Sequence, residues 1–206
     1  MKLSSALWIS TLGLWFCVSC GNDPEPAELI DVYTKLNVGN FWIYDWYSID
    51  GSGVETYLST DTLSITKDTV VSNTRMFIRS GTKLGEFTRD LLFDSANTLY
   101  TYPEGDVLFT LDTSLMVTKS FGTESTPAAI GNFELDEMVT LVEVPAGLFA
   151  CLNFTGQIES TDPNYEFGPR DNDNFFAKNV GLIKLKTQFL DSPENLEMRL
   201  TQYRVR

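Results

Sequence analysis

The stretch FWIYDWY at residues 41–47, followed by DGSG at residues 50–53, decides the fold class of this chain. Aromatic and β-branched residues favour extended backbone because their side chains pack well on a pleated, half-buried surface. The DGSG segment contains residues that tolerate positive φ, and it therefore predicts a hairpin turn. Together the two segments predict an aromatic strand that turns back on itself, which is the basic unit of an antiparallel sheet.

Similar short runs rich in Val, Ile, Thr, Tyr and Phe recur along the chain, separated by Gly, Asn, Asp and Pro. We find no convincing amphipathic helix after residue 31 and no repeat of fixed period. Residues 32–206 are therefore expected to form one all-β domain, an antiparallel β-meander that is either a curved open barrel or a β-sandwich. The further predicted strands cover residues 55–58, 62–66, 75–80, 85–90, 99–102, 107–112, 138–144, 150–158, 180–189 and 197–205.

The first 31 residues differ in character from the rest of the chain. An apolar run at residues 3–18 is too short to span a membrane comfortably, and it ends in Ser19 directly before Cys20. Residues 1–19 are therefore predicted to be a cleaved export signal, and Cys20 the residue that receives a lipid. An uncleaved anchor and an ordinary secretory signal are the alternatives. Residues 20–31 are acidic and contain proline, which predicts a flexible tether.

The composition excludes several classes of function. Acidic residues number 28 against 15 basic ones, a net charge of -13 that would repel nucleic acid. The chain has no histidine, which removes Ser-His and Cys-His nucleophiles and most zinc sites. Cys17 would be removed with the signal and Cys20 would carry the lipid, which leaves Cys151 without a cysteine partner. No intramolecular disulfide is therefore expected, and Cys151 is interpreted as a small buried hydrophobe.

Three blocks resemble a family of Bacteroidetes lipoproteins with no assigned activity: VGNFWIY at residues 38–44, VPAGLF at 144–149 and NVGLIK at 179–184. Val18-Ser19-Cys20 resembles the lipobox of such proteins. The resemblance implies an antiparallel half-barrel akin to proteins that carry lipoproteins through the periplasm. It also implies an outer membrane lipoprotein of the cell envelope, with the acids after Cys20 resembling a signal for surface display. The triplets at residues 61–63, 68–70 and 94–96 resemble O-glycan acceptor motifs of that group.

Two sets of carboxylates in the sequence could support chemistry. Asp171 and Asp173 lie in a polar stretch, residues 162–174, whose oxygen atoms would suit a calcium ion, but Phe175 and Phe176 break the helix-loop-helix calcium pattern. The stretch is therefore interpreted as a polar loop without metal, with Asp171 and Asp173 as the only calcium candidates. Glu134, Asp136 and Glu137 could act as acid and base in sugar cleavage, although sequence does not give their separation. No catalytic or cofactor-binding residue is predicted.

The aromatic residues at 41–47 belong either to the core or to a binding platform, and at most half of them can be exposed. Three functions remain. The first is a lipid-anchored, non-catalytic binding or accessory module of the cell envelope. The second is a carrier of a lipid or other hydrophobic ligand in a half-barrel cavity, and the third is a carboxylate-based hydrolase. The expected partners are the membrane, through the N-terminal lipid, and an envelope protein, a glycan or a hydrophobic ligand; nucleic acid is not expected.

Overall fold

The computed structural model describes residues 33–123, 126–164, 168–188 and 193–206. The predicted signal, Cys20 and the tether lie outside these residues. Within the described part of the chain, no helix is long and apolar enough to cross a membrane. The strands are β1 (Phe41–Ile49), β2 (Glu55–Val71), β3 (Thr74–Lys83), β4 (Glu86–Ser95), β5 (Thr98–Tyr102), β6 (Val107–Thr110), β7 (Val117–Thr123), β8 (Thr126–Val144), β9 (Gly147–Ser160), β10 (Arg170–Ala177), β11 (Gly181–Gln188) and β12 (Asn195–Arg204).

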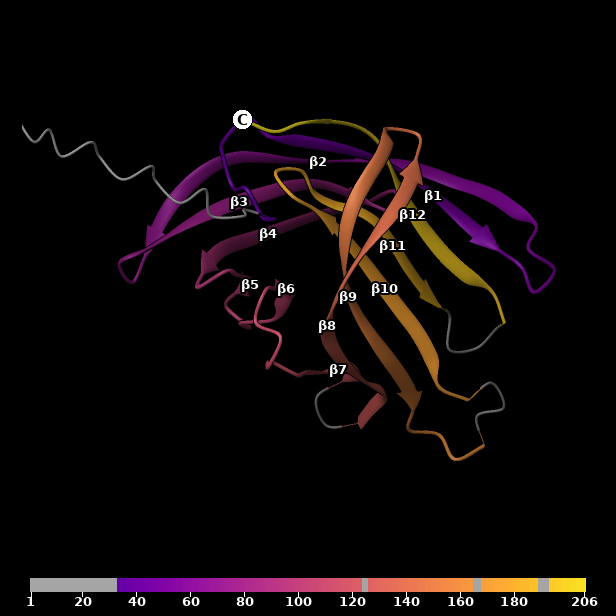
Figure 1. Cartoon of the computed structure of the whole chain (residues 1–206). Coiled ribbons are helices and arrows are strands. Elements are labelled where there is room, and N and C mark those ends of the chain that lie inside the picture. The colour runs from indigo at the N-terminus through magenta and orange to yellow at the C-terminus, as the bar shows by residue number, and fades with distance from the viewer. Residues whose placement is uncertain (1–32, 124–125, 165–167, 189–192) are drawn as a thin grey trace, which may run out of the picture. The chain divides into compact units, whose positions relative to one another are not determined.

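These strands form one antiparallel sheet in the order β6-β5-β4-β3-β2-β1-β12-β11-β10-β9-β8-β7. Each half of the chain is a meander, and the halves join where β1 pairs with β12. The prediction of an all-β antiparallel meander curved like a barrel is confirmed, and the sandwich alternative is wrong because the sheet is continuous. Figure 1 shows that β2, β3 and β4 run in a clearly different direction from β9 and β10, as expected for a strongly coiled sheet.

The central strand β1 shows why the sheet has two distinct faces. Trp42, Tyr44 and Trp46 alternate along it and are buried, whereas Phe41 and Tyr47 point to the opposite face and are half-buried. The guanidinium groups of two arginines from β12 cover these outer rings, at 5.1 Å from the centroid of Phe41 and 4.6 Å from that of Tyr47. The core interpretation is therefore confirmed for the three inner aromatic residues.

Phe109 on the edge strand β6 closes the curvature of the sheet. Its ring centroid lies 4.3 Å from that of Phe176 on β10 and 6.4 Å from that of Phe154 on β9, strands that are far from β6 in the sheet order. Tyr33 lies against the same ring at 5.6 Å. Because Phe109 is completely buried, these contacts make one face of the sheet concave and fill its closed side with aromatic rings.

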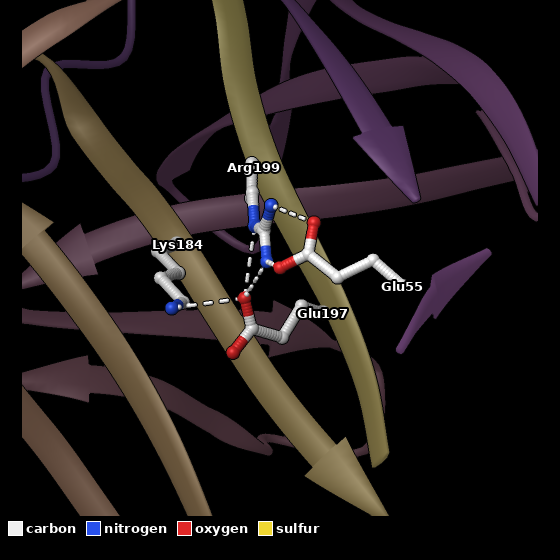
Figure 2. A network of polar contacts seen from close by, with 4 residues as sticks. All are labelled: Glu55, Lys184, Glu197 and Arg199. Atoms are coloured by element: carbon white, nitrogen blue, oxygen red, sulfur yellow. Dashed lines mark hydrogen bonds and ion pairs between the residues drawn. The ribbon is translucent and has the colours of Figure 1, made fainter. Parts of the chain in front are cut away.

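A polar network on the outer face crosses the junction of the two halves (Figure 2). Glu197 on β12 is buried and forms ion pairs with Lys184 at 2.9 Å and Arg199 at 2.7 Å. Arg199 also donates hydrogen bonds of 2.8 and 2.6 Å to the two carboxylate oxygens of Glu55 on β2. The hydrogen bonds from Arg199 are the main reason why the pKa of Glu55 lies below its ordinary value. The network therefore links β2 to β11 across the central pair of strands.

Replacing Glu197 by glutamine is expected to lower the free energy of unfolding by about 2 kcal/mol. The substitution leaves Lys184 and Arg199 facing each other without the carboxylate that separates their charges, and partial exposure of both cations limits the loss. Urea unfolding followed by circular dichroism measures it. Glu143→Gln is the matched control, because Glu143 is exposed and forms no ion pair with any described residue. Equal stability of the two variants would contradict the role given to Glu197.

Candidate functional site

The concave face contains a partly open cavity of about 330 Å³. Its walls come mainly from the first half of the sheet, with contributions from β10, β11 and β12. The alternation described for β1 places large inner side chains there, so the walls are predominantly apolar. The principal apolar lining residues are Trp42, Trp46, Ile65, Leu92, Leu99 and Phe176.

The cavity is lined by buried apolar residues and, at a polar rim, by partly exposed charged residues. Trp46 and Ile65 are each 1% exposed and Leu92 is 2% exposed. In contrast, the side chains of Arg79 and Asp90, which also line the cavity, are 25% and 28% exposed and form an ion pair of 2.7 Å. A ligand that entered this space would therefore place an apolar part among buried rings and a polar part against the ion pair.

The end of the β3–β4 hairpin forms part of this rim. The pairing of β2 with β3 ends where Gly81 lies opposite Leu63, and a Cβ atom on Gly81 would come within 1.8 Å of the carbonyl oxygen of Thr62. Only a glycine allows the two backbones to approach so closely. Next to this close approach, Thr82 and Lys83 at the end of β3 line the cavity.

The carboxylate of Asp61 on β2 binds the turn of the β3–β4 hairpin. Its carboxylate is 1% exposed and accepts hydrogen bonds from the backbone N–H groups of Leu84 and Gly85. Both turn residues have positive φ, 52° and 80°, as the two-residue turn of a tight hairpin requires. Asp61 therefore acts as a clamp between β2 and the hairpin end.

Two inner aromatic residues fix the start of β11. The indole N–H of Trp42 donates a hydrogen bond of 2.7 Å to the carbonyl oxygen of Val180. The hydroxyl of Tyr44 donates one of 3.0 Å to the carbonyl oxygen of Leu182. Burial raises the pKa of Tyr44 well above its ordinary value. The positive charge of nearby Arg79 lowers this pKa, but by less than burial raises it. Tyr44 is therefore a neutral hydrogen-bond donor at physiological pH.

Two other polar groups in the lining are buried without a partner. These are the indole N–H of Trp46 and the hydroxyl of Thr101, neither of which has a hydrogen bond to any described residue. Buried donors are rarely left unpaired, because losing water without a replacement bond costs about 1–3 kcal/mol. Both atoms are covered by neighbouring protein atoms, so they are not open to a ligand in the cavity.

The calcium candidates lie elsewhere. Asp171 and Asp173 belong to strand β10, so the prediction that residues 170–174 form a loop is wrong. Neither carboxylate lines the cavity. Asp173 accepts hydrogen bonds of 2.8 and 3.0 Å from Asn153 and Thr155, and Asp171 accepts one of 3.4 Å from Gln157. Among the described residues, no group of three or more Asp, Glu or Cys side chains is placed to hold a metal. Calcium binding by these two residues was not expected and stays an untested alternative.

The carboxylates considered for hydrolysis are also remote from the cavity. Glu134 is exposed on β8 between Phe133 and Leu135, both of which are buried. Asp136 accepts a hydrogen bond of 2.9 Å from the backbone N–H of Met138, where β8 bulges. The structure therefore brings neither carboxylate to the concave face.

Cys151 is completely buried, as interpreted from the sequence. Burial raises the pKa of its thiol to about 11, so the thiolate needed for nucleophilic chemistry is scarce at neutral pH. Two of the three glycan-like triplets lie within β2, and the third lies at the end of β4. The buried carboxylate of Asp61 is part of the first, so this Asp has a structural role there.

No family model matches the chain, and no curated protein matches it. Two solved structures are distantly similar. One is a protein of Bacteroides fragilis, inferred to be exported and with a YmcC-like fold: it is 10% identical with a TM-score of 0.49, and the match covers 84% of this chain and 99% of the other. The second is a protein of Parabacteroides distasonis, inferred to be a lipoprotein, which is 12% identical with a TM-score of 0.45 and the same coverage.

Proposed function

We propose that this protein is a lipid-anchored, non-catalytic module of the cell envelope that binds a small hydrophobic ligand in the cavity of its curved sheet. The cavity carries the proposal. Its volume of about 330 Å³ lies within the range of small-molecule sites, and apolar walls with a few polar groups are typical of them. Attachment to the outer membrane through Cys20 would hold this cavity beside a source of such ligands.

The hydrolase and the flat binding platform receive less support. The carboxylates at 134 and 136 lie on the solvent side of β8, and the inner aromatic residues of β1 are covered. A carrier or sensor of hydrophobic molecules needs an apolar cavity and no catalytic group, and the described residues provide such a cavity.

The proposal predicts that affinity rises with the length of an alkyl ligand. Each added methylene that enters the cavity should strengthen binding by about 0.8 kcal/mol, roughly fourfold, until the space is filled, after which affinity levels off. Alkyl chains from octyl to hexadecyl are titrated by displacement of a polarity-sensitive fluorescent probe. The full chain carries Cys20→Ser, which removes the predicted attachment point and the need for detergent.

Thr101→Phe is the test variant, because its ring would occupy the cavity from β5. Thr56→Phe is the matched control, since Thr56 is exposed on β2 and does not line the cavity. Binding should be lost in Thr101→Phe and retained in Thr56→Phe, while circular dichroism checks that both variants are folded. Equal binding by both folded variants, or no binding by the parent chain, would contradict the proposal.

A further inference from the structure

The charges around the cavity differ in sign from those of the chain as a whole. Five charged residues line it, and three of them are cations (Lys35, Arg79 and Lys83) against two anions (Asp61 and Asp90). The lining therefore carries a formal charge of +1, in a chain whose net charge is -13. An excess of cations beside a low-dielectric apolar wall attracts anions more strongly than the same charges on an open surface.

Both anions of the lining are already engaged by the protein. Asp61 accepts the backbone N–H groups of the β3–β4 turn. One oxygen of Asp90 accepts hydrogen bonds of 3.1 and 2.7 Å from Nε and Nη2 of Arg79. No hydrogen bond from Nη1 of Arg79 to a described residue is formed, and neither Lys35 nor Lys83 has an ion pair in the described part of the chain. Cationic donor capacity therefore remains at the rim.

We propose that the ligand is an anionic amphiphile, whose apolar part lies among Trp46, Ile65 and Leu92 and whose oxyanion head group binds Arg79 at the rim. This inference rests on the proposed function and names its ligand class. A carboxylate and a phosphate monoester present the same chemistry to a guanidinium group, namely paired acceptor oxygens with negative charge. Lys83 and Lys35 supply further positive charge around the head group.

The test compares ligands that share a dodecyl chain and differ in the head group. Dodecanoate and dodecyl phosphate represent the two oxyanions, dodecanol is neutral and dodecyltrimethylammonium is cationic, all below their micelle concentrations. We expect both oxyanions to bind about tenfold more tightly than dodecanol, and the cation to bind more weakly still. The ratio of the affinities for dodecanoate and dodecyl phosphate then shows whether a carboxylate or a phosphate head group fits the site better.

Two variants should act in opposite directions. Arg79→Gln removes the proposed anchor and should weaken oxyanion binding about tenfold, while dodecanol changes less than about twofold. Asp90→Asn releases Arg79 from its intramolecular partner and should strengthen oxyanion binding by about threefold. A purely structural role for the ion pair would weaken binding in both variants and for all head groups. Lys67→Gln, on the exposed part of β2 outside the cavity, is the control for loss of a positive charge.

The outcomes separate this inference from the proposed function. Dodecanol and the oxyanions could bind equally, with Thr101→Phe abolishing the binding of both. The cavity would then bind hydrophobic ligands, and the inferred preference for an anionic head group would be wrong. If none of the dodecyl compounds binds, the proposed function itself is wrong. Preferential binding of the oxyanions that is unchanged in Arg79→Gln would also overturn the inference, because the preference would then arise elsewhere.

Discussion

Phe109→Ala is expected to destabilise the protein by about 4 kcal/mol, because it removes a completely buried ring from the contact that closes the sheet. The ring packs between Phe176, Phe154 and Tyr33, which come from β10, β9 and the segment before β1. Their positions are set by the coiling of the whole sheet, so they cannot move together to fill the space. Such a loss is a large fraction of the stability of about 5–15 kcal/mol that is typical of a domain.

Equilibrium unfolding in urea with tryptophan fluorescence measures this loss. Phe109→Leu keeps most of the buried volume and should cost less than about 2 kcal/mol. Phe87→Ala removes a ring that is 75% exposed and should change stability by less than about 0.5 kcal/mol. If Phe109→Ala were no more destabilising than Phe87→Ala, β6 would not close the sheet in the way described.

Gly81→Ala is expected to cost about 3 kcal/mol and also to impair ligand binding. The added methyl group would overlap the carbonyl oxygen of Thr62 at 1.8 Å, and this atom belongs to backbone that cannot rotate away. Relief requires the β3–β4 hairpin to move outward from β2. Such a movement would break the hydrogen bonds that Asp61 accepts from the turn and withdraw Lys83 from the rim of the cavity.

Gly51→Ala is the matched control, because a Cβ atom at Gly51 would meet nothing within 4 Å and its φ is not in the left-handed region. Thermal unfolding and the alkyl-ligand titration are measured on both variants. A Gly81→Ala protein with the stability and affinity of Gly51→Ala would show that the close approach at Thr62 does not hold the hairpin.

The sequence predicted the aromatic strand at the centre of the sheet because nearly all of its residues are aromatic or β-branched and a turn segment follows it. The strands that it missed lack that pattern. Strand β10 begins RDNDN, and its half-buried Asn174 has its amide satisfied by the carbonyl oxygen of Phe154, to which it donates at 2.9 Å. Composition alone therefore suggested a loop, because Asn and Asp are depleted in strands unless tertiary partners satisfy them.

Strand β7 and the first half of β8 were missed for a related reason. Gly131 breaks the apolar pattern of β8, and Gly156 lies on the partner strand β9. The ring of Phe133 covers both glycines, since a Cβ atom at Gly131 or Gly156 would come within 2.8 or 2.5 Å of it. In the sequence such a glycine indicates a break in the strand. In the fold, its missing side chain leaves room for an aromatic ring. That relation depends on register, which composition does not reveal.

The cavity was foreseen only as one of three alternatives. Its apolar walls include the inner side chains of β1, but its shape also depends on the close approach of Gly81 to Thr62 and on the contact of Phe109 with distant strands. The pairing of Arg79 with Asp90 likewise requires the register of β3 and β4, in which the two residues lie directly opposite each other. Long-range geometry of this kind decides the candidate site and is not encoded in any short segment.

The most direct test of the central claim is to locate a bound ligand. Crystals of the protein grown with a saturating concentration of an alkyl carboxylate brominated at its terminal carbon would give an anomalous signal at the end of the apolar chain. The account predicts one bromine site per chain, within the concave face among Trp46, Ile65 and Leu92, with the carboxylate directed toward Arg79. Bromine found only on the outer surface, or an empty cavity at saturating ligand, would contradict it.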